Sequence, residues 1–103
     1  MTPNLSVGPG VIRETIRLAA LEVPGVLRVG RGGPRWRDVL GGSPIRIRIR
    51  DGRVDVTLRV VVRPRQPLVS LTAQVRDAVG AAVERLLGME LGAVTVVVDG
   101  VGG

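Results

Sequence analysis

The chain has 103 residues, 45% of them hydrophobic, which suits a single domain with one core. It contains no cysteine and no histidine, so disulfides, thiolate or imidazole catalysis and the usual zinc sites are excluded. The formal net charge is +6 and every basic residue is arginine, which suits phosphate, nucleic acid or an anionic membrane surface, or reflects a GC-rich genome.

The first predicted element is a helix that follows a short lead-in, residues 1–7, which we expect to be frayed. Gly8 and Pro9 favour a helix start, because proline fits the first helical position. Apolar residues then recur at helical spacing until Pro24, which disfavours the α conformation in the residue before it. After this break, residues 26–29 are expected to form a short strand.

The amino terminus lacks the basic and apolar segments of a signal peptide. No apolar run approaches the ~20 residues that are needed to span a bilayer. We therefore expect an intracellular protein.

Residues 30–44 are rich in glycine, arginine and proline, and we expect them to form a loop. Within this loop, residues 35–40 have the apolar spacing of one or two helical turns. The segment contains Trp36, the only aromatic residue of the chain, between two arginines. Two interpretations of Trp36 stay open: it closes the loop over the core, or it contacts a binding partner.

Two alternating runs, 45–50 and 53–62, flank the dipeptide Asp51-Gly52 and predict a β-hairpin. The dipeptide favours a type I′ turn, because that turn requires a positive φ at both central residues. Alternation gives each strand one apolar and one polar face. The predicted register pairs Arg50 with Arg53, Ile49 with Val54, Arg48 with Asp55, Ile47 with Val56, and Ile45 with Leu58.

A second helix is predicted from about Leu68, after Pro67 has ended the hairpin strand, with Gly88 as its C-terminal cap. Residues 94–98 are valine and threonine throughout and predict the last strand. A glycine-rich tail, 100–103, is expected to be flexible. The apolar stripe of the second helix comprises Leu71, Val75, Ala78, Val79, Ala82, Val83 and Leu86.

These elements follow the order α-β-β-β-α-β within a single domain, residues 1–103. Two amphipathic helices and one sheet predict an α+β fold, a two-layer sandwich with both main helices on one face of a mixed four-stranded sheet. The β-helix-β crossover should make the third and fourth strands parallel.

The polar face of the hairpin is the candidate binding site, and we call it the arginine surface. Two interpretations stay open: a solvated sheet face with one favourable cross-strand pair, or a surface that meets an acidic or phosphate-bearing partner. Five arginines stand against one carboxylate, Asp55. The arginine surface consists of Arg46, Arg48, Arg50, Arg53 and Arg59.

Catalytic, cofactor and metal sites are not predicted. No two carboxylates are spaced for acid/base chemistry, and no serine has the context of a nucleophile elbow. The glycine clusters lack the dinucleotide fingerprint, and the chain has no lysine for a Walker motif. The sequence therefore predicts no enzyme, no cofactor and no metal, and the candidate partner contacts are the arginine surface and Trp36.

Several stretches, in their order, resemble the alkaline shock protein family of bacteria, also called the envelope stress response family. The resemblance covers most of the chain from Gly8 to Val101. The matching stretches are Glu22-Val23-Pro24-Gly25-Val26, Asp51-Gly52-Arg53-Val54-Asp55-Val56, Leu87-Gly88 with Glu90, and the valine-rich last strand.

The resemblance implies a small non-enzymatic cytoplasmic protein linked to cell-envelope homeostasis. Some members of the family self-associate and are held at the membrane by a separate anchoring protein. This chain departs from the family pattern at residues 63–65, where arginine and proline replace an acidic-aromatic-glycine segment, and in its basic charge.

The main functional hypothesis is therefore a binding or scaffolding module that forms a homo-oligomer and meets a protein partner, such as a small membrane anchor. The alternative hypothesis is that the arginine surface binds nucleic acid or an anionic lipid surface. A small-molecule enzyme would need a polar pocket that the sequence does not predict.

Overall fold

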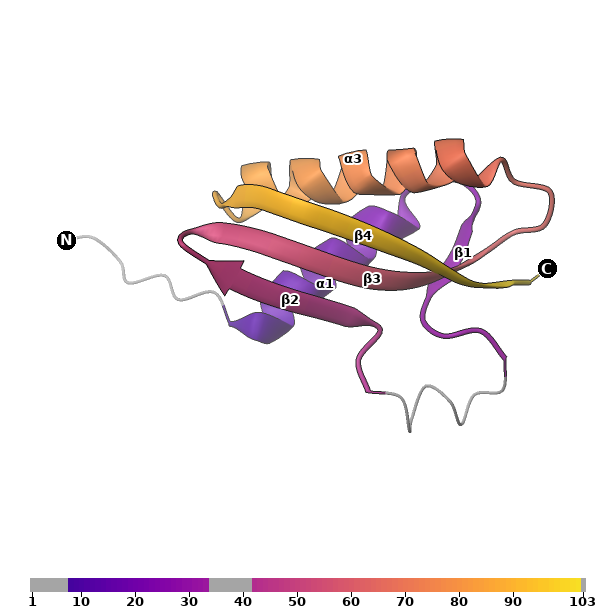
Figure 1. Ribbon diagram of the computed structural model, residues 1–103, viewed down its shortest axis with the longest axis horizontal. Coiled ribbons are helices and arrows are strands. Elements are labelled where there is room, and N and C mark those ends of the chain that lie inside the picture. Colours follow the sequence, from indigo (N-terminus) through magenta and orange to yellow (C-terminus); the bar gives the residue numbers. More distant parts are fainter. Residues whose placement is uncertain (1–7, 34–41, 103) are drawn as a thin grey trace.

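The structure is a computed structural model that describes residues 8–33 and 42–102 (Figure 1). Within these ranges the order of elements is α-β-β-β-α-β, as predicted. The lead-in 1–7, the turn predicted at 35–40 and Trp36 lie outside the described residues. The elements are α1 (Pro9–Leu21), β1 (Val26–Val29), β2 (Ile45–Arg50), β3 (Arg53–Val62), α3 (Leu68–Leu86) and β4 (Glu90–Val101).

β3 is the central strand of the sheet, and each of the other three strands pairs with it. β4 runs parallel to β3 along one side, from Arg53 to Val62. β2 and β1 run antiparallel to β3 along its other side, β2 beside its first half and β1 beside its last three residues. The sheet is therefore mixed, as predicted, and the third and fourth strands are parallel.

The β2–β3 hairpin has the predicted register at all six pairs. Asp51 and Gly52 have φ angles of 50° and 75°, which is the pair of positive values that a type I′ turn requires. Asp51 accepts this left-handed conformation because aspartate tolerates it better than most residues do. The two-residue loop sets the register, and the register places all the arginines of the hairpin on one face.

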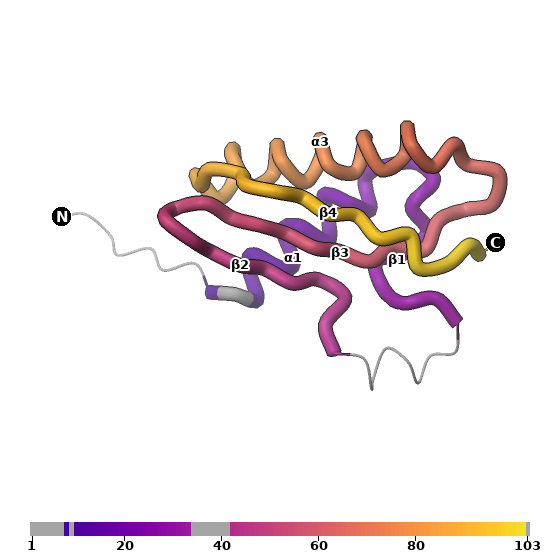
Figure 2. The backbone as a smooth tube through the Cα atoms, in the orientation of Figure 1, coloured from indigo at the N-terminus to yellow at the C-terminus, as the bar shows by residue number. Residues whose placement is uncertain are grey.

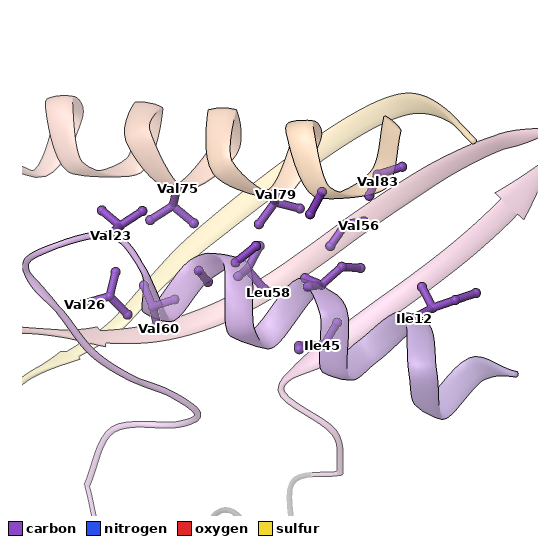
Figure 3. Close-up of a cluster of buried hydrophobic side chains, with 14 of the residues drawn as sticks. Ile12, Val23, Val26, Ile45, Val56, Leu58, Val60, Val75, Val79 and Val83 are labelled. Atoms are coloured by element: carbon purple, nitrogen blue, oxygen red, sulfur yellow. The ribbon is translucent and has the colours of Figure 1, made fainter. Parts of the chain in front are cut away.

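Both helices pack against the same face of the sheet, and the core lies between the two layers (Figures 1 and 3). Every second residue of β3 points into this core and is essentially fully buried. The core is aliphatic, and β-branched side chains suit both the strands and this tight layer. The buried residues of β3 on this face are Val54, Val56, Leu58, Val60 and Val62.

The helix boundaries follow from proline and glycine. Gly8 is the N-cap of α1 and a proline occupies its first turn, as predicted. The chain turns at Gly25, whose φ of 101° would strain any residue that has a Cβ. Gly88, with a φ of 63°, follows the C-cap of α3.

Two details of the carboxyl-terminal half differ from the sequence prediction. Leu86 was predicted within the apolar stripe of α3, but it is 73% exposed, because it lines the open groove between α1 and α3 rather than the core. The last strand spans Glu90–Val101 rather than 94–98. Because β4 pairs in parallel with the long β3, residues of low β propensity also become part of the strand. The register between the two strands shifts near Gly92 and Asp99. Figure 2 shows β4 following β3 along its whole length.

Candidate functional site

The arginine surface lies on the face of the sheet that the helices leave uncovered. β2 contributes three of its members and β3 contributes two. Their alternate neighbours point the other way: Ile45 is 3% exposed and belongs to the core. The structure therefore brings together the five predicted arginines on two adjacent strands.

The three arginines of β2 are exposed, and none of them forms an ion pair with any residue in the described part of the chain. Arg48 has Asp55 as its cross-strand neighbour, as predicted. The carboxylate of Asp55, however, turns toward β4, where its Oδ1 accepts a hydrogen bond from the backbone N–H of Ala93 at 2.8 Å. The cross-strand position is confirmed, and the ion pair expected there does not form.

The two arginines of β3 have acidic neighbours on β4. Arg53 lies 3.3 Å from Glu90, but both side chains are about two-thirds exposed, so this pair contributes little to stability. Arg59 Nη1 lies 3.2 Å from Asp99 Oδ1, and the Asp99 side chain is only 15% exposed. The other oxygen of Asp99 accepts a hydrogen bond from the N–H of Gly32 at 2.7 Å.

Arg59 thus differs from the arginines of β2, because its guanidinium already contacts a carboxylate that the fold holds in place. Sequence reasoning missed this contact. Arg59 and Asp99 are 40 residues apart, and only the register of the parallel β3–β4 pair brings them together. The β-branched composition of the last strand was visible in the sequence, but its register against β3 was not.

A groove of about 550 Å³ lies over β2 and joins the arginine surface to the helix layer. It is lined by Arg13 from α1, Arg46 and Arg48 from β2, and Asp55 and Thr57 from β3, among others. Three arginines and one aspartate are thus among its lining residues, and the carboxylate of that aspartate already accepts a hydrogen bond from a β4 amide. The groove is therefore suited to an anionic ligand.

Elsewhere on α1, Arg17 donates hydrogen bonds to the carboxylate of Glu14. This contact lowers the pKa of Glu14 from its ordinary value. Both side chains are about half exposed and lie one helical turn apart on the outer face of α1, so the pair adds little to the stability of the fold.

The described residues contain no group of three or more acidic side chains placed to hold a metal ion. Neither α1 nor α3 combines the length and the apolar character that crossing a membrane requires.

Comparison with solved structures gives matches over most of the chain. A histidine-to-alanine variant of MamM CTD matches with a TM-score of 0.60 and 15% sequence identity, covering 90% of this chain and 98% of that one. A copper form of MamM CTD matches with a TM-score of 0.56 and 21% identity, covering 89% and 85%. At these identities the likeness concerns the fold alone.

Comparison with curated protein sequences gives no match. The model of one protein family, the alkaline shock protein 23 family, matches residues 2–102, and that family is described as having a cell envelope-related function. The match spans almost the whole chain and agrees with the family resemblance of the stretches after the first helix, in the hairpin and in the last strand. The chain therefore belongs to the alkaline shock protein 23 family.

Proposed function

We propose that this protein is a non-enzymatic binding and scaffolding module, which binds an acidic protein partner through its arginine surface and self-associates. The observation that carries the proposal is the row Arg46, Arg48 and Arg50 on an uncovered sheet face. These side chains are exposed and have no ion-pair partner among the residues at 8–33 and 42–102.

A sheet face that contacts only solvent gains nothing from a row of like charges. Arg50 stands directly opposite Arg53 across the hairpin, and like charges in that position destabilise a strand pair; Arg53 has the exposed Glu90 beside it, whereas Arg50 has no carboxylate among the described residues. The repeat along β2 adds further like charges on the same face. Carboxylates of a partner would remove this repulsion and form charge-assisted hydrogen bonds with guanidinium groups. The arrangement therefore favours an anionic ligand over a merely solvated face.

The family supports the setting of this activity. A cell envelope-related function fits a cytoplasmic module that a partner, such as a small membrane anchor, holds at the membrane. The sequence has no histidine or cysteine for acid/base or nucleophilic chemistry, which supports a binding role over a catalytic one.

Three probes distinguish the classes of partner: a labelled octaglutamate peptide, labelled single-stranded RNA, and phosphatidylglycerol vesicles. Fluorescence anisotropy measures how tightly the protein binds each of them. We expect the acidic peptide to bind at low salt, and the triple variant R46Q/R48Q/R50Q to weaken that binding at least about tenfold, which corresponds to 1.4 kcal/mol. The control is R63Q/R76Q/R85Q, which removes the same charge from exposed arginines elsewhere.

Equal weakening in both variants would show that net charge alone governs binding and would contradict the proposal. Binding of RNA or vesicles without the peptide would instead support the alternative function of the arginine surface. In that case, the affinity for RNA or vesicles should fall steeply as the salt concentration rises.

The outer edge of β4 supports the self-association. β4 pairs only with β3 in the described part of the chain, so its other edge presents unpaired backbone groups. Residues 94–98 are valine and threonine, without charge or proline. Two copies joined antiparallel about a two-fold axis at Val96 would place Val94 opposite Val98, and Thr95 opposite Val97. Sedimentation velocity at rising concentration tests this, and a strictly monomeric protein would contradict it.

A further inference from the structure

β2 forms the other edge of the sheet together with the short β1, and the outer backbone groups of β2 can be assigned. In a hairpin with a two-residue loop, the residues beside the turn form a hydrogen-bonded pair, and every second pair follows. Arg50, Arg48 and Arg46 therefore direct their backbone groups toward β3. The N–H of Arg59 donates to the carbonyl of Pro44 at 2.9 Å, which continues the same series. Ile45, Ile47 and Ile49 must direct theirs outward.

One of these three residues already has a partner. The hydroxyl of Ser43 donates to the carbonyl of Ile45 at 2.9 Å, and the N–H of Ile45 donates back to the same hydroxyl at 3.2 Å. The N–H and C=O groups of Ile47 and Ile49 remain directed outward, and no hydrogen bond to them is formed by the described residues. β2 therefore presents two donors and two acceptors along its outer edge.

The side chains beside this edge differ between the two faces of the sheet. On the uncovered face stand Arg46, Arg48 and Arg50, about 7 Å apart because alternate residues of a strand are two rises apart. On the helix face, Ile47 is half-buried and Ile49 is 51% exposed. A strand added here would meet cations with one set of alternate side chains and isoleucines with the other.

We propose that the outer edge of β2 binds an extended peptide of alternating acidic and apolar residues, as a fifth strand of the sheet. The inference rests on the proposed function and names the chemistry of the partner segment. Acidic side chains of the peptide lie beside the arginines of β2, at the 4.5–5.5 Å separation of cross-strand neighbours. Its apolar side chains cover Ile49, and its backbone pairs with Ile47 and Ile49.

Other occupants fit fewer of these features. RNA or a lipid surface would neutralise the arginines, but neither would pair with the backbone groups of β2 nor cover Ile49. A second copy joined edge to edge through β2 would bring two rows of arginine together, which charge repulsion disfavours. The arginines therefore select an acidic strand and exclude the strand's own copy.

The experiment compares three labelled peptides by fluorescence anisotropy. The first has four glutamate-valine repeats, the second has the same residues in two blocks, and the third is the alternating peptide with N-methyl groups on the amides of one edge. We expect the block and N-methylated peptides to bind at least tenfold more weakly than the alternating peptide. Hydrogen exchange should slow at the amides of Ile47 and Ile49 when the alternating peptide binds.

A protein variant gives an independent measurement. Ile49→Pro removes one outward N–H without removing a hydrogen bond to β3 or any arginine, and proline is tolerated on edge strands. The control is Ile49→Val, which keeps the N–H and the β-branched side chain. We expect the proline variant to lose at least tenfold in affinity for the alternating peptide, and the valine variant to match the parent protein.

Equal binding of all three peptides would overturn the inference that the peptide pairs with the β2 edge, even if the R46Q/R48Q/R50Q variant no longer bound any of them. That result would leave the arginine surface as a charged site without strand pairing. Failure of every acidic peptide to bind would instead contradict the proposed function itself. The peptide comparison does not depend on whether Ile49→Pro folds, so the inference stays testable.

Discussion

The sheet has two outer edges, and they carry opposite kinds of side chain. Along β2 every second residue is an arginine, whereas the central part of β4, residues 94–98, has no charge. Charged residues on an edge strand discourage pairing with a second copy, and uncharged β-branched residues permit it. We infer that the two edges have different partners, an acidic strand for β2 and another copy of the chain for β4.

The edges also differ in how firmly the fold holds them. β4 is anchored near both ends by carboxylates of the uncovered face: Asp55 accepts from Ala93, and Asp99 binds both Gly32 and Arg59. β2 has a turn at one end and Ser43 at the other. Side-chain hydrogen bonds therefore anchor the uncharged edge to the rest of the fold at more points than the charged edge.

The largest expected effect comes from charging the β4 edge. In Thr95→Lys/Val97→Lys, antiparallel pairing near Val96 would bring lysines of two copies together, and like charges at an interface cost several kcal/mol. We expect self-association to weaken at least about a hundredfold by sedimentation velocity, which corresponds to about 2.8 kcal/mol.

The matched control is Thr57→Lys/Gln74→Lys, which adds the same charge on the central strand and on an exposed position of α3. If both variants associate as the parent does, the β4 edge is not the interface. If Thr95→Lys/Val97→Lys also weakened the binding of the acidic peptide, the two edges would not have separate partners.

The second prediction concerns the end of β4. A Cβ on Gly32 would lie 2.3 Å from the backbone carbonyl oxygen of Asp99, and a backbone atom cannot move aside at low cost. We expect Gly32→Ala to lower the free energy of unfolding by about 2–3 kcal/mol in urea titrations. Gly10→Ala is the control, since its Cβ meets open space within α1 and should stabilise the helix by up to about 1 kcal/mol.

A smaller effect is expected at the beginning of β4. Asp55→Ala removes the acceptor of the Ala93 N–H, but water can reach this exposed site. We expect a loss of about 1 kcal/mol in the free energy of unfolding. Asp77→Ala, at an exposed carboxylate of α3, should change it by less than half of that amount. Equal effects in the two variants would contradict an anchoring role of Asp55.

The smallest effect is expected at the Arg53–Glu90 pair. Both side chains are about two-thirds exposed, and solvent screens an ion pair of this kind. We expect Glu90→Gln to change the free energy of unfolding by less than about 0.5 kcal/mol, measured as above. A larger loss would show that the pair, and not only Asp55, holds the beginning of β4 against β3.

Local signals predicted the parts of the fold that depend on neighbouring residues. The Asp51-Gly52 turn determines the hairpin register, and the register determines which face the arginines occupy. Proline placed the end of α1 and the beginning of α3. The same reasoning predicted the arginine surface as a group, because alternation alone puts its members on one side.

Features that depend on the order of strands in the sheet could not be predicted from the sequence. The pairing of Arg59 with Asp99 requires the β3–β4 register, which no local pattern encodes. The outward backbone groups of Ile47 and Ile49 matter only because β2 is an edge strand, and the sequence does not say which strands are central. The length of β4 was underestimated because its pairing with β3 extends through glycines that disfavour a strand in isolation.

The dependence of the whole sheet on β3 has a consequence for how the chain folds. The hairpin of β2 and β3 closes over two residues, whereas β4 reaches β3 only after 19 residues of α3 and their connections have been ordered. Local contacts form sooner than distant ones, so we expect the hairpin to form first and β4 to dock last. During synthesis, the hairpin also leaves the ribosome before β4 does. The edge that we propose for an acidic partner is therefore in place before the edge that we propose for self-association.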